Sequence, residues 1–400
     1  MKDVVIIMKV PFLDLKRQYE QIKVDIEPKI IEVARSGAYI GGKYVETFEA
    51  EMREYLGVKH VISCANGTDA LMIALRAFDV GVGDEVITTP FTFYATAEAI
   101  AAVGAVPVFV DVNESDFNID PSKIEAAITP KTKAIMPVHI FGWSCDMEAI
   151  NDIARKHNLK VVEDAAQAIG CEYNGRKIGA SDNIVTFSFY PTKNLGAFGD
   201  AGMVTTDDDD LAIVLRALRE HGMAKNGAMA QEILYGIKDE FAMDSVTDSL
   251  YNPYKYYNYI VGYNSRLDAM QAAILSIKLK HLDEYNKKRS DIASIYEKGL
   301  CDVVRTPVAP KNGKSCFHQY AVLTEDKEGL GAFLGEKGVG TGAFYPVPLH
   351  LQKAFINLGY KEGDLPVAEG LAKRSVCLPI FPELDAEEAE YVVQCIREFA

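Results

Sequence analysis

The sequence predicts an α/β fold: a large domain with a mostly parallel sheet covered by helices, followed by a smaller C-terminal α+β domain. From about residue 58, short β-branched runs alternate with amphipathic helical segments, which is typical of βαβ units. After about Gly222 this alternation ends, and residues 300–400 mix short strands with helices. A chain of 400 residues has room for two or three structural units. We place the large domain at residues 1–250 and the small one at 251–400.

The expected elements follow from periodicity, taken in chain order. A helix should run from about residue 12 to a stop near Gly37. Short apolar runs predict strands at 60–65, 84–93, 106–112, 133–142, 159–166 and 183–190, and helical spacing follows or precedes most of them, at 68–78, 96–103, 121–128 and 147–157. A long helix is expected over 265–296 with Ser265 as its cap, and the C-terminal part should hold a strand at 319–323 and helices at 328–336 and 386–398.

Composition excludes several classes of protein. Forty-two basic against 57 acidic residues give a net charge of −15, so binding of nucleic acid through a broad basic face is not expected. The apolar run Val4 to Met8 is far shorter than a signal peptide needs, and no run is long enough to span a bilayer. Seven cysteines are scattered singly without zinc-site spacing, so we expect reduced thiols and no metal site. The chain is expected to work in the cytoplasm, without a membrane partner.

One expected strand end has the composition of a phosphate-binding turn. Gly67 allows close approach of a ligand to the backbone, and Thr68 adds a hydroxyl beside the free N–H groups of a helix N-terminus. The alternative interpretation is an ordinary strand–helix turn with a polar cap.

Two other expected strand ends carry ionisable residues. Glu163 and Asp164 end a hydrophobic strand, where a buried carboxylate needs a partner, although either could simply cap the next helix. Lys193 follows an aromatic strand within a run of small and polar residues. Such a lysine, if desolvated, would be an amine nucleophile, whereas the alternative is an exposed loop lysine.

Together, the three strand ends form the set of groups that pyridoxal phosphate requires. A lysine amine can form a Schiff base with its aldehyde, a carboxylate can keep its pyridine nitrogen protonated, and a turn can hold its phosphate. Phe93, at a further strand end, could stack on the ring, although core packing is an equal alternative.

The chain resembles the pyridoxal-phosphate-dependent sugar-nucleotide aminotransferases of the DegT family, which have the aspartate-aminotransferase-like fold type I. The resemblance runs nearly end to end, through PFLDLKRQY, SGAYIGGKYVETFE, SCANGTDAL, GDEVITTPFTFYATAEAI, ITPKTKAIMPVHIFG, VVEDAAQAIG, SFYPTKNLGAFGDAG, GYNSRLDAMQAAIL, FHQY, YPVPLHLQKAF and LPIFPEL. It implies a transaminase that moves an amino group from L-glutamate to a keto group of a nucleotide-diphosphate-linked sugar, with a weak preference for 3-oxo over 4-oxo sugars, in amino-sugar biosynthesis.

The resemblance also implies roles for single residues. Lys193 would be the Schiff-base lysine and Asp164 the partner of the pyridine nitrogen. The other cofactor contacts implied are Gly67, Thr68 and Ser188 at the phosphate, Gln167 at the ring hydroxyl, Phe93 on the ring face, and Asn264 at the phosphate of a neighbouring subunit, which implies a homodimer with shared active sites. Arg266, His318 and Tyr345 would line the substrate pocket, and a structural hydrogen bond is an equal alternative for His318.

Three other functions are weighed against amino transfer. Related sugar dehydratases carry His where this chain has Lys193, and a nicotinamide-dependent oxidoreductase should show GxGxxG after the first strand, which is missing. A non-catalytic regulatory protein on this fold should lack the lysine or the acid, and both are present. A tyrosine-rich stretch at 224–257 is longer than in many relatives, which leaves the sugar specificity open.

Overall fold

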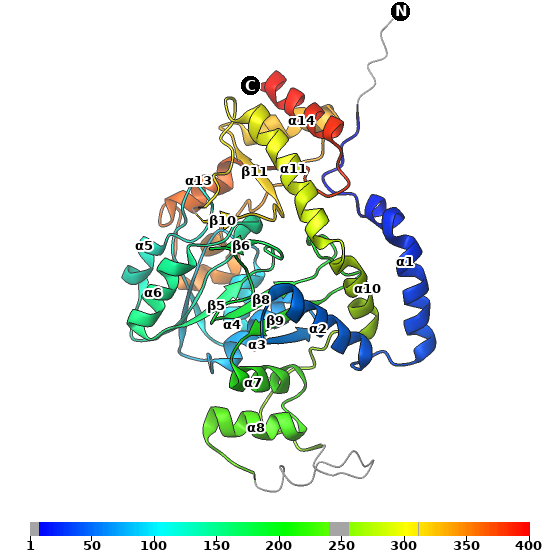
Figure 1. Cartoon of the computed structure of the whole chain (residues 1–400). Coiled ribbons are helices and arrows are strands. Elements are labelled where there is room, and N and C mark those ends of the chain that lie inside the picture. Colours follow the sequence, from blue (N-terminus) through cyan, green and yellow to red (C-terminus); the bar gives the residue numbers. More distant parts are fainter. Residues whose placement is uncertain (1–7, 240–255, 311) are drawn as a thin grey trace, which may run out of the picture.

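The fold is built on a seven-stranded central sheet (Figure 1). The computed structural model describes residues 8–239, 256–310 and 312–400. The sheet order is β1-β9-β8-β5-β4-β2-β3, with bounds β1 (His60–Cys64), β2 (Glu85–Thr88), β3 (Val106–Phe109), β4 (Thr132–Met136), β5 (Lys160–Asp164), β8 (Ile184–Ser188) and β9 (Gly202–Thr206). Neighbours from β8 to β3 are parallel, and β9 runs antiparallel to β1 and β8. The predicted α/β class with a mostly parallel sheet is confirmed.

Helices cover both faces of the sheet. On one face lie α3 (Gly67–Ala77), α4 (Ala95–Ala102) and α7 (Asp209–Arg219), and on the other α2 (Lys43–Leu56), α6 (Met147–His157) and α10 (Ala269–Leu279). Side chains alternate between faces along a strand. In β5, Val162 therefore packs in the core on the α3 side, and Val161 packs in the core on the α6 side. The same alternation sends Asp164 and Glu163 to opposite faces.

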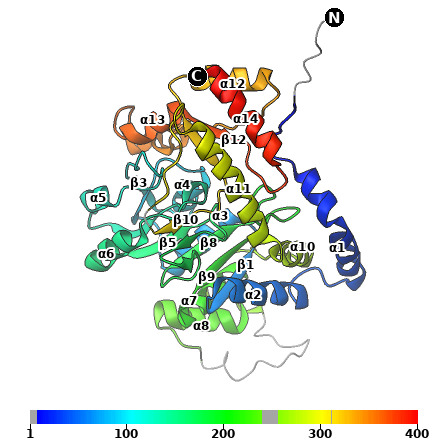
Figure 2. The same cartoon turned by 45° about the horizontal axis from the view of Figure 1, so that its top comes forward.

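The C-terminal part forms a second layer around a two-stranded sheet (Figure 2). It comprises α11 (Leu282–Leu300), β11 (Tyr320–Leu323), α12 (Lys327–Glu336), α13 (Pro366–Arg374), β12 (Ser375–Leu378) and α14 (Ala386–Phe399). Residues of α11, β11, α12, β12 and α14 share one apolar core. The expected domain boundary at 250/251 lies outside the described residues, so that division stays a prediction.

Short elements complete the structure. These are α5 (Pro121–Ile124), α8 (Ala224–Tyr235), the small sheet of β6 (Glu172–Tyr173), β7 (Arg176–Lys177) and β10 (Gly313–Lys314), and 3-10 turns at Glu125–Ala127, Ile140–Gly142, Leu349–Leu351 and Lys353–Leu358. The first part of the tyrosine-rich stretch forms α8, and residues 240–255 of it lie outside the described residues. Within the described ranges, no helix is long and apolar enough to cross a membrane.

The expected N-terminal helix is confirmed, and two other expectations are wrong. Helix α1 (Leu15–Ser36) ends at Gly37, whose φ of 67° is the left-handed conformation that glycine adopts freely. The single helix expected over 265–296 is two helices, α10 and α11, and α10 begins after the N-cap Asp268 rather than at Ser265. Strand β9 was not expected, because the glycine-rich run before it indicated only flexible backbone.

Candidate active site

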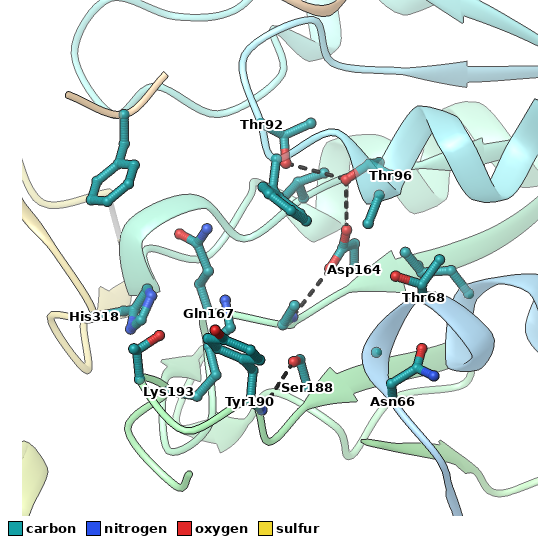
Figure 3. A pocket seen from close by; sticks show the side chains of 18 of the residues that line it. Asn66, Thr68, Thr92, Thr96, Asp164, Gln167, Ser188, Tyr190, Lys193 and His318 are labelled. Carbon is teal, nitrogen blue, oxygen red and sulfur yellow. Dashed lines mark hydrogen bonds between the residues drawn. The ribbon is translucent and has the colours of Figure 1, made fainter. Parts of the chain in front are cut away.

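A cavity of about 540 Å³ opens at the carboxyl ends of the parallel strands, where α/β proteins bind ligands. Residues at the ends of β1, β5 and β8 line it, together with residues of the C-terminal layer (Figure 3). Its size suits a small organic ligand. Nine of the residues singled out in the sequence line this one cavity: Gly67, Thr68, Phe93, Asp164, Gln167, Ser188, Lys193, His318 and Tyr345.

The turn between β1 and α3 presents free backbone donors to the cavity. Asn66 caps α3 by accepting a hydrogen bond from the Asp69 N–H at 2.8 Å, which leaves the first two N–H groups of the helix without an intrahelical partner. A Cβ at Gly67 would lie only 2.7 Å from the Ser188 Cβ, so glycine is needed for this close approach. The Thr68 side chain and Ser188 line the same end of the cavity. This geometry suits an anion such as phosphate.

Asp164 is the acid that faces the cavity. Its carboxylate is buried and accepts hydrogen bonds from the Thr96 hydroxyl at 2.8 Å and the Ala166 N–H at 3.1 Å. Burial raises the pKa of Asp164, and these two donors and the charge of Lys193 oppose that shift. Glu163 points to the other face of the sheet, where it pairs with His139 at 2.9 Å. Neither acid caps the following helix as the alternative interpretation proposed, although Asp164 does hold the Ala166 N–H of the turn.

Lys193 provides a free amine beside this acid. The turn that carries it is closed by a hydrogen bond from the Lys193 N–H to the Tyr190 carbonyl oxygen at 2.8 Å. Its half-buried side chain lines the cavity, and in the part of the chain that the structure describes its amine makes no hydrogen bond or ion pair. Burial lowers the pKa of this amine to about 8, against the opposing effect of Asp164. The structure therefore does not place Lys193 on an exposed loop.

Gln167, Tyr345 and Phe93 form the wall next to Asp164. The Gln167 side chain accepts a hydrogen bond from the Phe141 N–H at 2.7 Å and donates one to the Tyr345 hydroxyl at 2.7 Å, which fixes the orientation of its amide. Burial raises the pKa of Tyr345, so its hydroxyl stays protonated. The Phe93 side chain is 58% exposed while lining the cavity, so core packing is not its role.

His318 closes the cavity on the side of the C-terminal layer. Its Nδ1 lies 3.1 Å from the Asn194 Oδ1, and burial together with the Lys193 charge keeps its pKa well below the usual range, so the ring is neutral. Asn194 and Arg289, which hold this region, were not predicted from the sequence. Asn194 directly follows Lys193, a position that could have signalled its role. Arg289 on α11 donates to the carbonyl oxygens of Phe317, His318 and Ile380, and no sequence motif indicated it.

Asn264 and Arg266 do not line the cavity of this chain. Asn264 is exposed, and the Arg266 guanidinium donates a hydrogen bond to its Oδ1 at 2.7 Å. The neighbouring Ser265 hydroxyl accepts a hydrogen bond from the Ala65 N–H at 3.2 Å, so this segment lies directly behind the β1–α3 turn.

The cavity residues fit pyridoxal phosphate on their own chemistry. The Lys193 amine, which has no partner among the described residues, the buried carboxylate of Asp164 and the close backbone approach at Gly67 all belong to one cavity. A cofactor with an aldehyde, a basic ring nitrogen and a phosphate would satisfy all three.

Comparison with known proteins places the chain in a family. Residues 20–397 match the model of the DegT/DnrJ/EryC1/StrS aminotransferase family. The chain belongs to this family. It is therefore an enzyme of the transaminase class, and its cofactor is pyridoxal phosphate.

Relatives and solved structures cover the chain nearly end to end. A protein of Geobacillus stearothermophilus named "Pleiotropic regulatory protein" is 49% identical, over 98% of this chain and 99% of its own length. A dTDP-3-amino-3,4,6-trideoxy-alpha-D-glucose transaminase of Streptomyces venezuelae is 41% identical, over 98% and 96%. The crystal structure of S. venezuelae DesV in complex with a ketimine intermediate superposes with a TM-score of 0.88 at 40% identity, covering 98% of both chains. The predicted family, fold type and cofactor are confirmed.

Proposed function

We propose that this aminotransferase moves an amino group from L-glutamate to the keto group of a nucleoside-diphosphate-linked sugar, with a 3-oxo sugar favoured, in amino-sugar biosynthesis. The observation that carries the reaction type is the presence of the Lys193 amine and the buried Asp164 carboxylate in one cavity, close enough for the charge of Asp164 to raise the pKa of Lys193. The name of the S. venezuelae transaminase, which refers to a 3-amino sugar, supports the choice of the carbon. Lys193 in place of the His of the dehydratases supports amino transfer over dehydration.

Each proposed role uses a group of this chain. Lys193 would attach the cofactor through its amine, and once released that amine would act as the base and acid that moves a proton at the reacting carbon of the substrate. When bound, pyridoxal phosphate supplies an electron sink for the substrate carbanion. Asp164 would keep the ring nitrogen protonated. The backbone of Gly67, with Thr68 and Ser188, would bind the phosphate. Gln167 would contact the ring hydroxyl and Phe93 would stack on the ring, while His318 and Tyr345 would orient the substrate.

The proposed working unit is a cytoplasmic homodimer with shared active sites. Asn264 is exposed and lies outside its own chain's cavity, which suits a residue that reaches the neighbouring subunit's phosphate. Arg266 beside it could then serve the diphosphate of the substrate, which needs local donors in a protein with a net charge of −15.

A mixed dimer tests the shared site. Neither Lys193→Ala nor Asn264→Ala alone should be active, because each site would lack one of the two residues. When the two variants are co-expressed, half of the dimers are mixed and carry one intact site each, so roughly a quarter of the normal activity should return. Activity no greater than the sum of the two separate variants would refute the shared site.

The substrate is tested with glutamate labelled with nitrogen-15 and matched 3-oxo and 4-oxo nucleotide sugars. Mass spectrometry of the products should show the label in the sugar, and more of it from the 3-oxo substrate. Lys193→Arg keeps the positive charge and removes the nucleophile, so it should lose transfer, whereas Lys287→Ala on the exposed face of α11 should not. Faster transfer to the 4-oxo sugar would contradict the choice of carbon.

The name of the G. stearothermophilus relative makes a regulatory role the second candidate. A purified protein that neither takes up pyridoxal phosphate nor transfers the label to any of these sugars would favour it.

A further inference from the structure

Two buried threonines, Thr92 and Thr96, are connected to the Asp164 carboxylate by a chain of hydrogen bonds. The Thr96 hydroxyl, at the start of α4, lies 2.8 Å from the Asp164 Oδ2, and the Thr92 hydroxyl lies 3.2 Å from that of Thr96 (Figure 3). The side chains of Thr92 and Thr96 belong to residues only 2% and 1% exposed. Both threonines line the cavity that holds Lys193.

The direction of this chain follows from its chemistry. An ionised carboxylate only accepts hydrogen bonds, so the single hydroxyl proton of Thr96 goes to Asp164. The Thr96 oxygen can then accept, and Thr92 is the donor to it. The second carboxylate oxygen, Oδ1, accepts from the Ala166 N–H at 3.1 Å. With one donor on each oxygen, the carboxylate plane cannot rotate freely.

We propose that Thr96 is a positioning residue, held by Thr92, that fixes the Asp164 carboxylate in the orientation and charge state needed to pair with the cofactor's ring nitrogen. This inference rests on the proposed role of Asp164. Hydrogen bonds to a charged group are stronger than those between neutral groups, and they strengthen one another in series. Thr96 is the first of the groups that oppose the effect of burial on the pKa of Asp164. Its loss would favour the neutral acid, which cannot balance a cationic ring.

The test measures cofactor binding to the apoprotein rather than turnover. Thr96→Val keeps the shape and removes the hydroxyl, so the Kd for pyridoxal phosphate, followed by absorbance, should rise roughly 10- to 100-fold. Thr92→Val leaves Thr96 without its donor and should raise the Kd by roughly 3- to 10-fold. Thr96→Ser keeps the hydroxyl and should stay within roughly twofold of the parent. Titration of the visible band with pH should be displaced in Thr96→Val and restored in Thr96→Ser.

A packing role predicts the opposite order, because serine deletes a buried methyl group whereas valine conserves the volume. Weaker binding by Thr96→Ser than by Thr96→Val would overturn the proposal, as would parental binding by Thr96→Val. If Thr96→Val does not fold, Thr92→Val decides, and a parental Kd and titration in that variant would overturn the proposal.

Two further variants separate this inference from the function on which it rests. The double variant Thr92→Val/Thr96→Val should bind pyridoxal phosphate no more weakly than Thr96→Val, because Thr92 acts through Thr96. Additive losses of affinity would refute the claim that Thr92 acts through Thr96. Asp164→Asn tests the proposed role of Asp164 as the partner of the ring nitrogen. Impaired binding in Asp164→Asn with parental binding in Thr96→Val refutes only the role of Thr96, whereas parental binding in Asp164→Asn refutes the role of Asp164 itself.

Discussion

The lowered pKa of Lys193 makes a quantitative prediction for the rate at which the apoprotein takes up its cofactor. Only the neutral amine attacks an aldehyde, so the rate should follow the neutral fraction of Lys193. With a pKa of about 8 in place of 10.5, the neutral fraction near pH 7 is roughly 300-fold greater than for an ordinary lysine. Between pH 8 and pH 10 the rate should rise only about twofold, against roughly 80-fold for an ordinary lysine.

Stopped-flow absorbance of apoprotein mixed with pyridoxal phosphate measures this rate. N-acetyl-lysine amide, treated in parallel, corrects for the ionisation of the cofactor itself. A rate that keeps rising almost tenfold per pH unit up to pH 10, after this correction, would refute the idea that burial activates Lys193.

Removing the charge of Asp164 should shift the midpoint of the pH–rate profile in the same assay. Its negative charge raises the pKa of Lys193, so Asp164→Asn should move the midpoint of the rate profile to lower pH. Asp200→Asn is the matched control, because Asp200 also lines the cavity but does not shift the pKa of Lys193. A midpoint that moves upward in Asp164→Asn, or moves equally in both variants, would contradict this electrostatic coupling.

Three further substitutions test the rest of the site. Gly67→Ala puts a Cβ 2.7 Å from the Ser188 Cβ and should weaken binding of pyridoxal phosphate roughly tenfold in an absorbance titration. Unchanged binding would refute the role of the β1–α3 turn in holding the phosphate. Arg289→Met removes the donor to three backbone carbonyl oxygens and should lower the free energy of unfolding in urea by about 2–4 kcal/mol. A decrease in this free energy smaller than the measurement error would contradict the role of Arg289. Tyr345→Phe removes the hydroxyl that accepts the hydrogen bond of the Gln167 amide at 2.7 Å and should raise the Kd for the cofactor roughly 3- to 10-fold. A Kd equal to that of the parent protein would refute the role of this hydrogen bond.

Periodicity predicted the fold well wherever a strand and its helix have distinct patterns. The strands expected at 60–65, 159–166 and 183–190 end at the cavity. Strands β5 and β8 are parallel neighbours, and β1 runs in the same direction because β9 lies antiparallel between β1 and β8, so their carboxyl ends lie at one edge of the sheet. Strand β9 was missed since its short apolar run lies between glycines and a run of acids. The break between α10 and α11 falls at Lys280 and His281, residues with no helix-breaking signal.

The choice between the neighbouring acids shows what a pattern alone leaves open. The sequence could not tell whether Glu163 or Asp164 faces a ligand, because that depends on the register of β5 against β4 and β8. The resemblance to relatives pointed to Asp164, and in the structure that carboxylate lines the cavity while Glu163 pairs with His139. Thr96 was not foreseen, because it precedes Asp164 by 68 residues and a threonine in an alanine-rich helix carries no signal.

Lys278 is an internal control for the claim that Lys193 is the lysine that attaches the cofactor. Burial lowers the pKa of this lysine to about 8, as it does for Lys193, but the Lys278 amine donates a hydrogen bond to the Gly196 carbonyl oxygen. The decisive measurement is borohydride reduction of the enzyme loaded with pyridoxal phosphate, followed by peptide mass spectrometry. We expect the added cofactor mass on the peptide that contains Lys193. Mass on the Lys278 peptide, or on no lysine, would contradict it.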